Sequence, residues 1–540
     1  MSSTINSDTF VELRESGKTF PQVPGLENPH TFVAAISKNV LASLARVMVV
    51  ALVALVLPAY LTHRLPVTTY AAWVLILELG AYISYLDLGV QTAVSKFVAE
   101  FDAKKDHYGA GQHASAGLVL MLLAGALGVA LTCGLAWQVP RLFRAMPSDL
   151  YHDVRISVLL IGFSLSFGLV CAAYSAVFLG LQHYWIPMTI TITNRVSFAV
   201  VIVAIVALHG NLAAMGSSVA FINVVSGLTQ IVAWRKKASH IPISVRLLKL
   251  RIFKNVARFC TLQSIWTIAM LCITGLDITI VGHYDYPNTA YYSIAALPTT
   301  FVLMMMSSLL GPIMPASSAM STQRSPAEMG NFLVKVTRYS TLVLLLTGLP
   351  LIVYGLPLLR LWVGPVYASN TIQYLRILVF ANIIRNLCAP YATMITATNR
   401  QGAATVVAIC EAVVNLGSSI YFAAHYGAVG VALGTMLGAF VSVLLHFGIT
   451  MHYTFSALAV SRITLFLKGL FQPAVVAIPS ILIMLFFSSL SRMAIVSALA
   501  WGMSTLFLAW FAGLKGQERS TLMNFVRKPL ISPGMLFTGF

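Results

Sequence analysis

The stretch SYLDLGVQTAVSKFVAEF, residues 84–101, begins inside a long apolar run and ends among charged residues. In a soluble protein it would be an ordinary amphipathic helix, although Asp87 and Gly89 interrupt its apolar part. The composition argues against a soluble protein. Of 540 residues, 58% are hydrophobic and only 9% are charged, whereas soluble domains carry about 25% charged residues. The chain is therefore predicted to be an all-α polytopic membrane protein.

Apolar runs long enough to cross a hydrocarbon core of about 30 Å as helices recur along the whole sequence. Fourteen spans are predicted, and the connections between them are too short to form a folded extramembrane domain. The spans cover residues 39–62, 70–95, 114–137, 154–179, 186–208, 213–234, 259–282, 291–318, 338–358, 371–396, 402–424, 429–452, 469–490 and 492–514.

Basic residues orient these spans. The chain has 34 Lys and Arg against 16 Asp and Glu, a net charge of +18. Most of the basic residues fall in segments that are cytoplasmic if the N-terminus is inside, as the positive-inside rule requires. Both termini are thus predicted to be cytoplasmic, and no nucleic-acid partner is needed to explain the charge.

The most basic connection, residues 235–258, carries eight Lys and Arg residues. Within it, Leu248, Ile252, Val256 and Phe259 share one face at helical spacing. Two interpretations stay open: an amphipathic helix lying in the anionic inner leaflet, or a solvated positive loop.

The predicted organisation has two lobes flanked by polar tails. It consists of a cytosolic tail (1–37), an N-lobe (38–234), the basic loop (235–258), a C-lobe (259–452), two further spans (453–514) and a cytosolic tail (515–540). No cleavable signal peptide is apparent in the first 37 residues. The six cysteines match neither a disulfide framework nor a metal site, and we expect no metal and no cofactor.

The two lobes resemble each other weakly at an offset of about 217–221 residues. Residues 66–70 and 287–291 precede the second and eighth spans, and residues 179–185 and 396–402 close the fourth and tenth. Because six spans are an even number, the copies are predicted to be parallel repeats. Such repeats commonly place a substrate path between the halves.

Charged residues inside predicted spans need an explanation, because each costs about 2.5–3.5 kcal/mol near the bilayer centre. They are Arg46, Arg195, Arg376, Arg385, Glu78, Asp87, Asp277 and Glu411. Arg195, Arg385 and Glu411 lie nearest the middle of their spans, where a side chain reaches the headgroups least effectively.

Two interpretations of the central arginines stay open. In one, Arg385 and Glu411, on consecutive helices, form an internal ion pair. In the other, Arg195, Arg385 and Arg46 face a wet cavity and hold an anionic group such as a phosphate. Guanidinium suits this role because it stays charged and binds phosphate through two hydrogen bonds.

The acidic residues are candidates for ion coupling or for structural roles. Glu78 and Asp87 are nine residues apart, about 180° around an ideal helix. They cannot face one cavity unless the helix bends, which Gly80 and Gly89 permit. A buried carboxylate can carry a proton, so these two residues, together with Asp277 and Glu411, could couple transport to an ion gradient.

Four stretches occur in an order that resembles a known family. They are LDLGVQTAVSKFVAEF (86–101), FLGLQHYW (178–185), LDITIVGHYDYPNTAYYSIA (276–295) and HYGAVGVALGTMLG (425–438). Together with the fourteen-span layout, they resemble bacterial Wzx-type polysaccharide flippases. These belong to the multidrug/oligosaccharidyl-lipid/polysaccharide (MOP) exporter superfamily.

The resemblance implies two six-helix lobes around a central cavity, with two further helices at the side. It implies that the protein moves undecaprenyl-diphosphate-linked oligosaccharides from the inner to the outer leaflet of the bacterial inner membrane by alternating access. The products would be O-antigen, capsule or exopolysaccharide. The implied partners are the lipid-linked glycan, membrane lipids, a polysaccharide polymerase and other assembly proteins. Asp87 and Asp277 match acids common in the family's motifs.

Two other functions were weighed. A multidrug exporter of the same superfamily shares the fold, but it usually has twelve spans and binds cations through carboxylates. A membrane enzyme of glycan assembly is disfavoured because the longest external connection, residues 140–155, is only about sixteen residues. The sequence also has no convincing H-x(4)-D motif or metal-ligand cluster. We therefore expect a transporter and not an enzyme.

Overall fold

The structure is a computed structural model that describes residues 29–475, 477 and 478. Within these residues the regular structure is entirely helical. Ten helices there are long and apolar enough to cross a membrane, or eleven if the bent pair Leu250–Thr261 and Gln263–Gly275 is one span. The prediction of an all-α membrane protein is thus confirmed for this part of the chain. The span predicted at 492–514, most of the one at 469–490 and most of both tails lie outside it.

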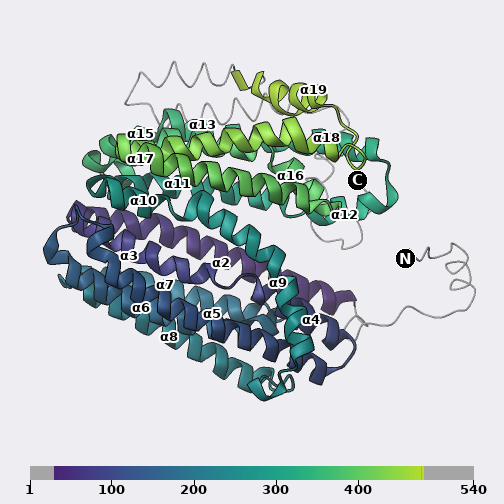
Figure 1. The fold of residues 1–540 in the computed structure, drawn as a ribbon, viewed down its shortest axis with the longest axis horizontal. Helices are drawn as coiled ribbons and strands as arrows, with labels where there is room; N and C mark the ends of the chain where they lie inside the picture. The colour runs from purple at the N-terminus through teal and green to yellow at the C-terminus, as the bar shows by residue number, and fades with distance from the viewer. Residues whose placement is uncertain (1–28, 476, 479–540) are drawn as a thin grey trace, which may run out of the picture.

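The N-terminal half forms one bundle, purple to blue-teal in Figure 1. It consists of α2 (Pro29–Arg64), α3 (Val67–Tyr85), α4 (Val90–Ala103), α5 (His107–Leu142), a 3₁₀ turn (Ser148–Leu150), α6 (Tyr151–Gly180), α7 (Trp185–Ala207) and α8 (Leu212–Lys237). Helix α6 lies at its centre, packed against α5 and α8, and α2 packs along α7.

The C-terminal half forms the second bundle, teal to yellow in Figure 1. It consists of α9 (Leu250–Met270), a π-helix (Leu271–Gly275), α10 (Asp277–Tyr284), a 3₁₀ turn (Tyr286–Asn288), α11 (Thr289–Leu310), α12 (Ile313–Gln323), α13 (Pro326–Val353), α14 (Gly355–Val363), α15 (Pro365–Asn386), α16 (Ala389–Ala397), α17 (Gln401–Leu445), a π-helix (His446–Thr450), α18 (Met451–Tyr453), α19 (Arg462–Thr464) and a π-helix (Leu465–Phe471). Helix α17 holds two predicted spans on either side of a kink at Gly427 (φ 58°, ψ −138°).

Polar residues visible in the sequence begin several of these helices. The side chain of Asp106 caps α5 and that of Asn211 caps α8, each accepting a backbone N–H three residues on. Ser325 and Glu328 form a reciprocal capping box at the start of α13. These caps satisfy orphan amides at the helix ends and so fix where the chain turns.

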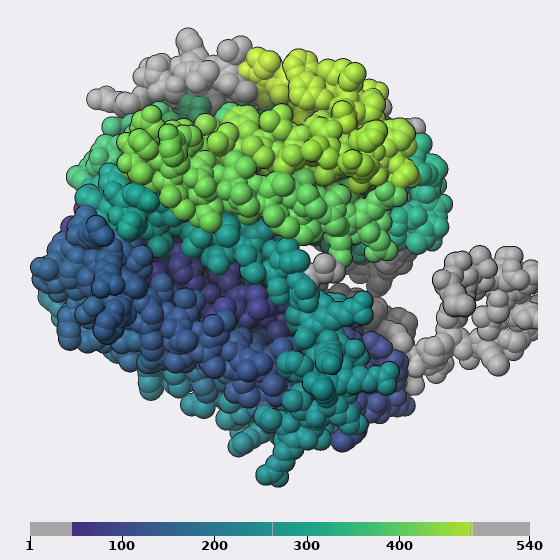
Figure 2. Space-filling model, viewed as in Figure 1, coloured from purple at the N-terminus to yellow at the C-terminus, as the bar shows by residue number. Residues whose placement is uncertain are grey.

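The two halves share a hydrophobic core at one end of the molecule. Trp73 of α3 and Tyr286 of the C-terminal half belong to the same buried cluster. The hydroxyl of Tyr286 donates to the carbonyl of Thr68 (2.8 Å), and Nε1 of Trp362 donates to the carbonyl of Leu55 (2.7 Å). Towards the opposite end, the face in Figure 2 is hollowed between the halves. The molecule is therefore closed at one end and indented at the other.

The stretch 84–101 breaks the second predicted span in two. Helices α3 and α4 are separate, whereas the sequence predicted one helix over 70–95. Gly89 lies between the two helices in the left-handed backbone region, with φ 82°. A Cβ at this position would lie 2.3 Å from Cγ of Gln263 in α9. The Asp87 carboxylate accepts a hydrogen bond from the Gln91 amide (3.3 Å) at the start of α4. Asp87 therefore lies just before the new helix α4 and accepts a hydrogen bond from its first turn.

The basic connection between the halves differs from its predicted form. The apolar helix predicted over 248–259 starts at Leu250 as part of α9, and Leu248 precedes it. Val256 is fully buried, and Ile252 and Phe259 pack against the hydrophobic core of the N-terminal half. Protein therefore covers part of this apolar face, while Leu248 and Leu250 stay exposed, and both interpretations of the basic connection remain predictions.

Candidate functional site

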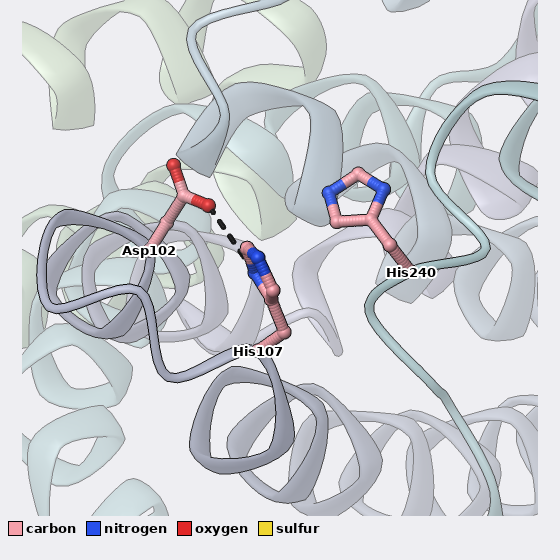
Figure 3. Close-up of side chains that lie close together, drawn as sticks. All are labelled: Asp102, His107 and His240. Carbon is pink, nitrogen blue, oxygen red and sulfur yellow. Dashed lines mark ion pairs between the residues drawn. The ribbon is translucent and has the colours of Figure 1, made fainter. Parts of the chain in front are cut away.

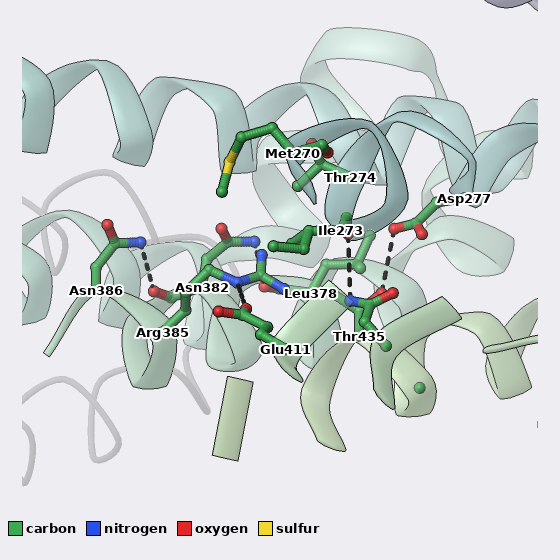
Figure 4. A network of polar contacts seen from close by, with 12 residues as sticks. Met270, Ile273, Thr274, Asp277, Leu378, Asn382, Arg385, Asn386, Glu411 and Thr435 are labelled. Carbon is green, nitrogen blue, oxygen red and sulfur yellow. Dashed lines mark hydrogen bonds and ion pairs between the residues drawn. The ribbon is translucent and has the colours of Figure 1, made fainter. Parts of the chain in front are cut away.

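A buried ion pair joins α15 and α17. Nε of Arg385 lies 2.5 Å from Oε1 of Glu411, and the two side chains are only 14% and 6% exposed (Figure 4). Nη2 of Arg385 is buried and has no hydrogen-bond partner in the part of the chain that the structure describes. The structure thus shows the internal pair that the sequence left as one alternative. Glu411 neutralises Arg385 in this structure, and the predicted role of Arg385 in binding an anionic substrate stays a prediction.

Asp277 begins α10 and is buried in the same half. Its Oδ2 accepts hydrogen bonds from Thr435 Oγ1 (3.1 Å) and Tyr292 OH (3.3 Å). Its Oδ1 is buried and lacks a hydrogen-bond partner among the described residues. Buried polar atoms are nearly always satisfied. An orphaned carboxylate oxygen within the membrane-spanning helices therefore makes Asp277 a candidate site for a proton or a cation.

The π-helix just before Asp277 shapes this site. Residues Leu271–Gly275 form one wide turn, and the carbonyl of Ile273 accepts a hydrogen bond from Nδ2 of Asn415 (3.2 Å) (Figure 4). Single π turns inside α-helices are frequent at functional sites. Sequence reasoning missed Asn415 and Thr435. The available clue was their polarity inside apolar spans, with Asn415 one helical turn after Glu411.

Glu78 brings another carboxylate to the boundary between the halves. It is half-buried on α3, and its charge interacts with that of Asp277. One turn along α3, the hydroxyl of Tyr82 hydrogen-bonds with Thr279 Oγ1 of α10, which ties the two halves together at this level. Asp277 also interacts electrostatically with Arg385.

Glu78 and Arg385 thus both interact electrostatically with Asp277, and Arg385 is paired with Glu411; these four groups are called the network below. When all four groups are ionised, Glu78, Asp277 and Glu411 outnumber Arg385, and the network carries a net negative charge. Uncompensated charge is costly in a low-dielectric interior. The network thus favours uptake of a proton or a small cation. Asp87 lies just before α4, where its Oδ1 accepts a hydrogen bond from the Gln91 amide, and no interaction joins it to the network among the described residues.

The remaining predicted cations lie in the N-terminal half. Arg195 is exposed on α7 and makes no hydrogen bond or ion pair with any described residue. Arg46 is half-buried on α2, which packs against α7, and its Nε is buried without a hydrogen-bond partner in the described part of the chain. The structure therefore separates the predicted cations: Arg385 is paired in one half, and in the other half neither Arg195 nor Arg46 has a carboxylate partner among the described residues.

No family model and no curated protein matches the sequence. Several solved structures match the fold. An inward-facing multidrug resistance MATE family transporter of the MOP superfamily aligns with a TM-score of 0.62 at 16% identity, over 76% of this chain and 94% of its own. The lipid II flippase MurJ, in an inward closed conformation, aligns with a TM-score of 0.68 at 14% identity, over 90% of this chain and all of its own. The chain has the fold of MOP-superfamily transporters.

A third solved structure also matches the fold of this chain. A MOP superfamily transporter from Pyrococcus furiosus, described by the reverse polarity of its binding pocket, aligns with a TM-score of 0.52 at 16% identity, over 80% of this chain and 99% of its own. The predicted MOP-type fold is thus confirmed for the described part of the chain, and all three neighbours are transporters or flippases. At these identities the likeness concerns architecture alone.

Proposed function

We propose that this protein is a flippase that moves undecaprenyl-diphosphate-linked oligosaccharides from the inner to the outer leaflet of the bacterial inner membrane. The observation that carries the proposal is its likeness to the lipid II flippase, which extends over 90% of this chain against 76% for the MATE transporter. The Wzx-type resemblance of the four sequence stretches supports the same substrate class. The glycan would feed O-antigen, capsule or exopolysaccharide synthesis.

The shape of the molecule supports alternating access. The halves are sealed by a shared core at one end, and the visible face is indented between them towards the other. The positive-inside prediction assigns the indented end to the cytoplasm, where a lipid-linked glycan would enter. Rocking the halves about their contacts would close that end and open the other.

We assign the anionic part of the substrate to Arg195 and Arg46. Both guanidinium groups lack a carboxylate partner in the described structure, unlike that of Arg385. A diphosphate would supply the missing charge through bidentate hydrogen bonds. The network of Glu78, Asp277, Arg385 and Glu411 would instead bind the coupling ion, because it carries an excess of carboxylates.

The predicted layout of fourteen spans, with two parallel six-helix repeats, remains part of this proposal. Corresponding turns support it: Gln182 and Asn399, 217 residues apart, have φ angles of 60° and 59°. In both turns the next amide bonds back to the carbonyl five residues earlier, at 2.8 and 2.9 Å. Both termini in the cytoplasm, and association with a polymerase and other assembly proteins, belong to the same proposal.

The alternative is a cation-coupled multidrug exporter, which the buried carboxylates of Glu78 and Asp277 favour. Lipids extracted from cells lacking the protein separate the two functions. A flippase predicts accumulation of undecaprenyl-diphosphate-linked oligosaccharide together with loss of the surface polymer. Unchanged lipids and polymer, in a strain without a second flippase, would contradict the proposal, and increased drug sensitivity would support the exporter.

A further inference from the structure

Three potential metal ligands from separate segments meet near the indented end of the N-terminal half. Asp102 lies in the last turn of α4, His107 is the first residue of α5, and His240 lies in the connector, residues 238–249, which joins the two halves. One ligand atom of each lies within 4.8 Å of the other two. Figure 3 shows the three side chains converging. It is the only such group of His, Cys, Asp and Glu found in the described residues.

We propose that Asp102, His107 and His240 form a binding site for a divalent transition metal of the zinc class. Two imidazoles and one carboxylate suit Zn²⁺ better than the all-oxygen sets preferred by Ca²⁺ or Mg²⁺. No metal was expected from the sequence, because His240 is distant along the chain from Asp102 and His107.

The distances are close to those of a zinc site. Bonds of 2.0–2.1 Å in a tetrahedron place neighbouring ligand atoms about 3.3 Å apart. Oδ1 of Asp102 already lies 3.6 Å from Nδ1 of His107. The ring centroids of His107 and His240 are 5.1 Å apart, with an interplanar angle of 81°. To bind zinc, ligand atoms that lie up to 4.8 Å apart must approach one another by at most about 1.5 Å. Rotation of the side chains is enough for this, since both imidazoles are exposed.

The backbone on the connector side is held in place. Nε1 of Trp234 donates to the carbonyl of Ile241 (3.2 Å), and the amide of Ser244 donates to Ser115 Oγ of α5 (3.1 Å). Ile241 itself is fully buried. His240 is therefore presented to the α4–α5 turn by fixed neighbours, which lowers the entropic cost of metal binding.

Two neighbouring lysines direct their charges elsewhere. Nζ of Lys104 pairs with Glu100 (2.8 Å), and Nζ of Lys237 lies 4.1 Å from the centroid of the Trp185 ring. His183 interacts electrostatically with both Asp102 and His240. The fourth coordination position would be taken by water.

Metal binding would have a structural consequence. It would fasten the connector to the α4–α5 turn with a second, reversible attachment beside the existing hydrogen bonds. This inference does not depend on which substrate is transported, because Asp102, His107 and His240 are not among the residues assigned to the substrate or to the coupling ion.

The test uses the untagged full-length protein in detergent, freed of metal with a chelator and then titrated calorimetrically with Zn²⁺. We expect one Zn²⁺ per chain. Asp102→Asn, His107→Gln and His240→Gln should each weaken binding at least about tenfold. His452→Ala is the matched control, because this exposed histidine lies outside the group, and it should bind like the wild type.

Hydrogen exchange gives a second readout. Zn²⁺ should slow exchange of amides in residues 238–249 of the wild type and leave the His240→Gln protein unchanged. Absence of saturable binding, or full binding by a monodisperse His107→Gln/His240→Gln protein, would overturn the site. Unchanged exchange in the zinc-bound wild type would overturn the fastening of the connector.

Discussion

Replacing Glu411 with glutamine removes one partner of the buried ion pair. Breaking such a pair costs about 3–5 kcal/mol, mainly because the other charge is left buried and uncompensated. Here the remaining charge is Arg385, whose side chain is 14% exposed and whose Nη2 already lacks a hydrogen-bond partner among the described residues. Asp277 interacts with Arg385 and offsets part of the loss. The expected destabilisation is therefore at the lower end, about 3 kcal/mol, or roughly a hundredfold in the folding equilibrium.

The assay is reversible unfolding of the purified protein in mixed micelles with increasing denaturing detergent, followed by circular dichroism. Arg385→Gln/Glu411→Gln should be more stable than Glu411→Gln, because the double variant leaves neither member of the pair as an uncompensated charge. Glu100→Gln is the control, since its pair with Lys104 is exposed (2.8 Å; side chains 45% and 60% exposed), and it should change stability far less. A Glu411→Gln protein as stable as this control, or a double variant that equals the sum of its single variants, would refute the reasoning.

Three further outcomes are expected. Gly89→Val should lower the melting temperature, because this position has φ 82° and an added Cβ would lie 2.3 Å from Gln263. Gly168→Ala is the control and should not lower it, since an added Cβ there would meet no atom within 4 Å. Equal melting temperatures of the two variants would contradict this. Asp277→Asn should leave the protein folded but reduce stimulation of transport by a cation or proton gradient on the order of tenfold, measured in vesicles, and an unchanged response would exclude this carboxylate from coupling. Arg195→Ala should lower surface polysaccharide at equal membrane abundance while Arg195→Lys retains more, and normal polysaccharide in the alanine variant would exclude an anion-binding role.

The sequence was informative where the physics is local. Apolar runs located the described helices, and Asp87 with Gly89 indicated a bend that the structure shows as a complete break. The pairing of Arg385 with Glu411 was foreseeable because consecutive helices usually lie side by side.

What the sequence could not predict depends on distant helices meeting. Thr435 and Tyr292 reach Asp277 only because α10, α11 and α17 pack together. Glu78 interacts with Asp277 only because α3 of one half abuts α10 of the other. The covered face of α9 was also hidden, since periodicity shows that a face is apolar and not what covers it.

The central claim is tested most directly by reconstitution. Purified protein would be placed in vesicles with the lipid-linked oligosaccharide isolated from deletion cells, and a membrane-impermeant glycosidase would be added outside. The account predicts that glycan in the inner leaflet becomes accessible with the wild type and stays protected in protein-free vesicles and with Arg195→Ala. Continued protection with active wild-type protein, together with uptake of a cationic drug into the same vesicles, would contradict the flippase and establish the exporter.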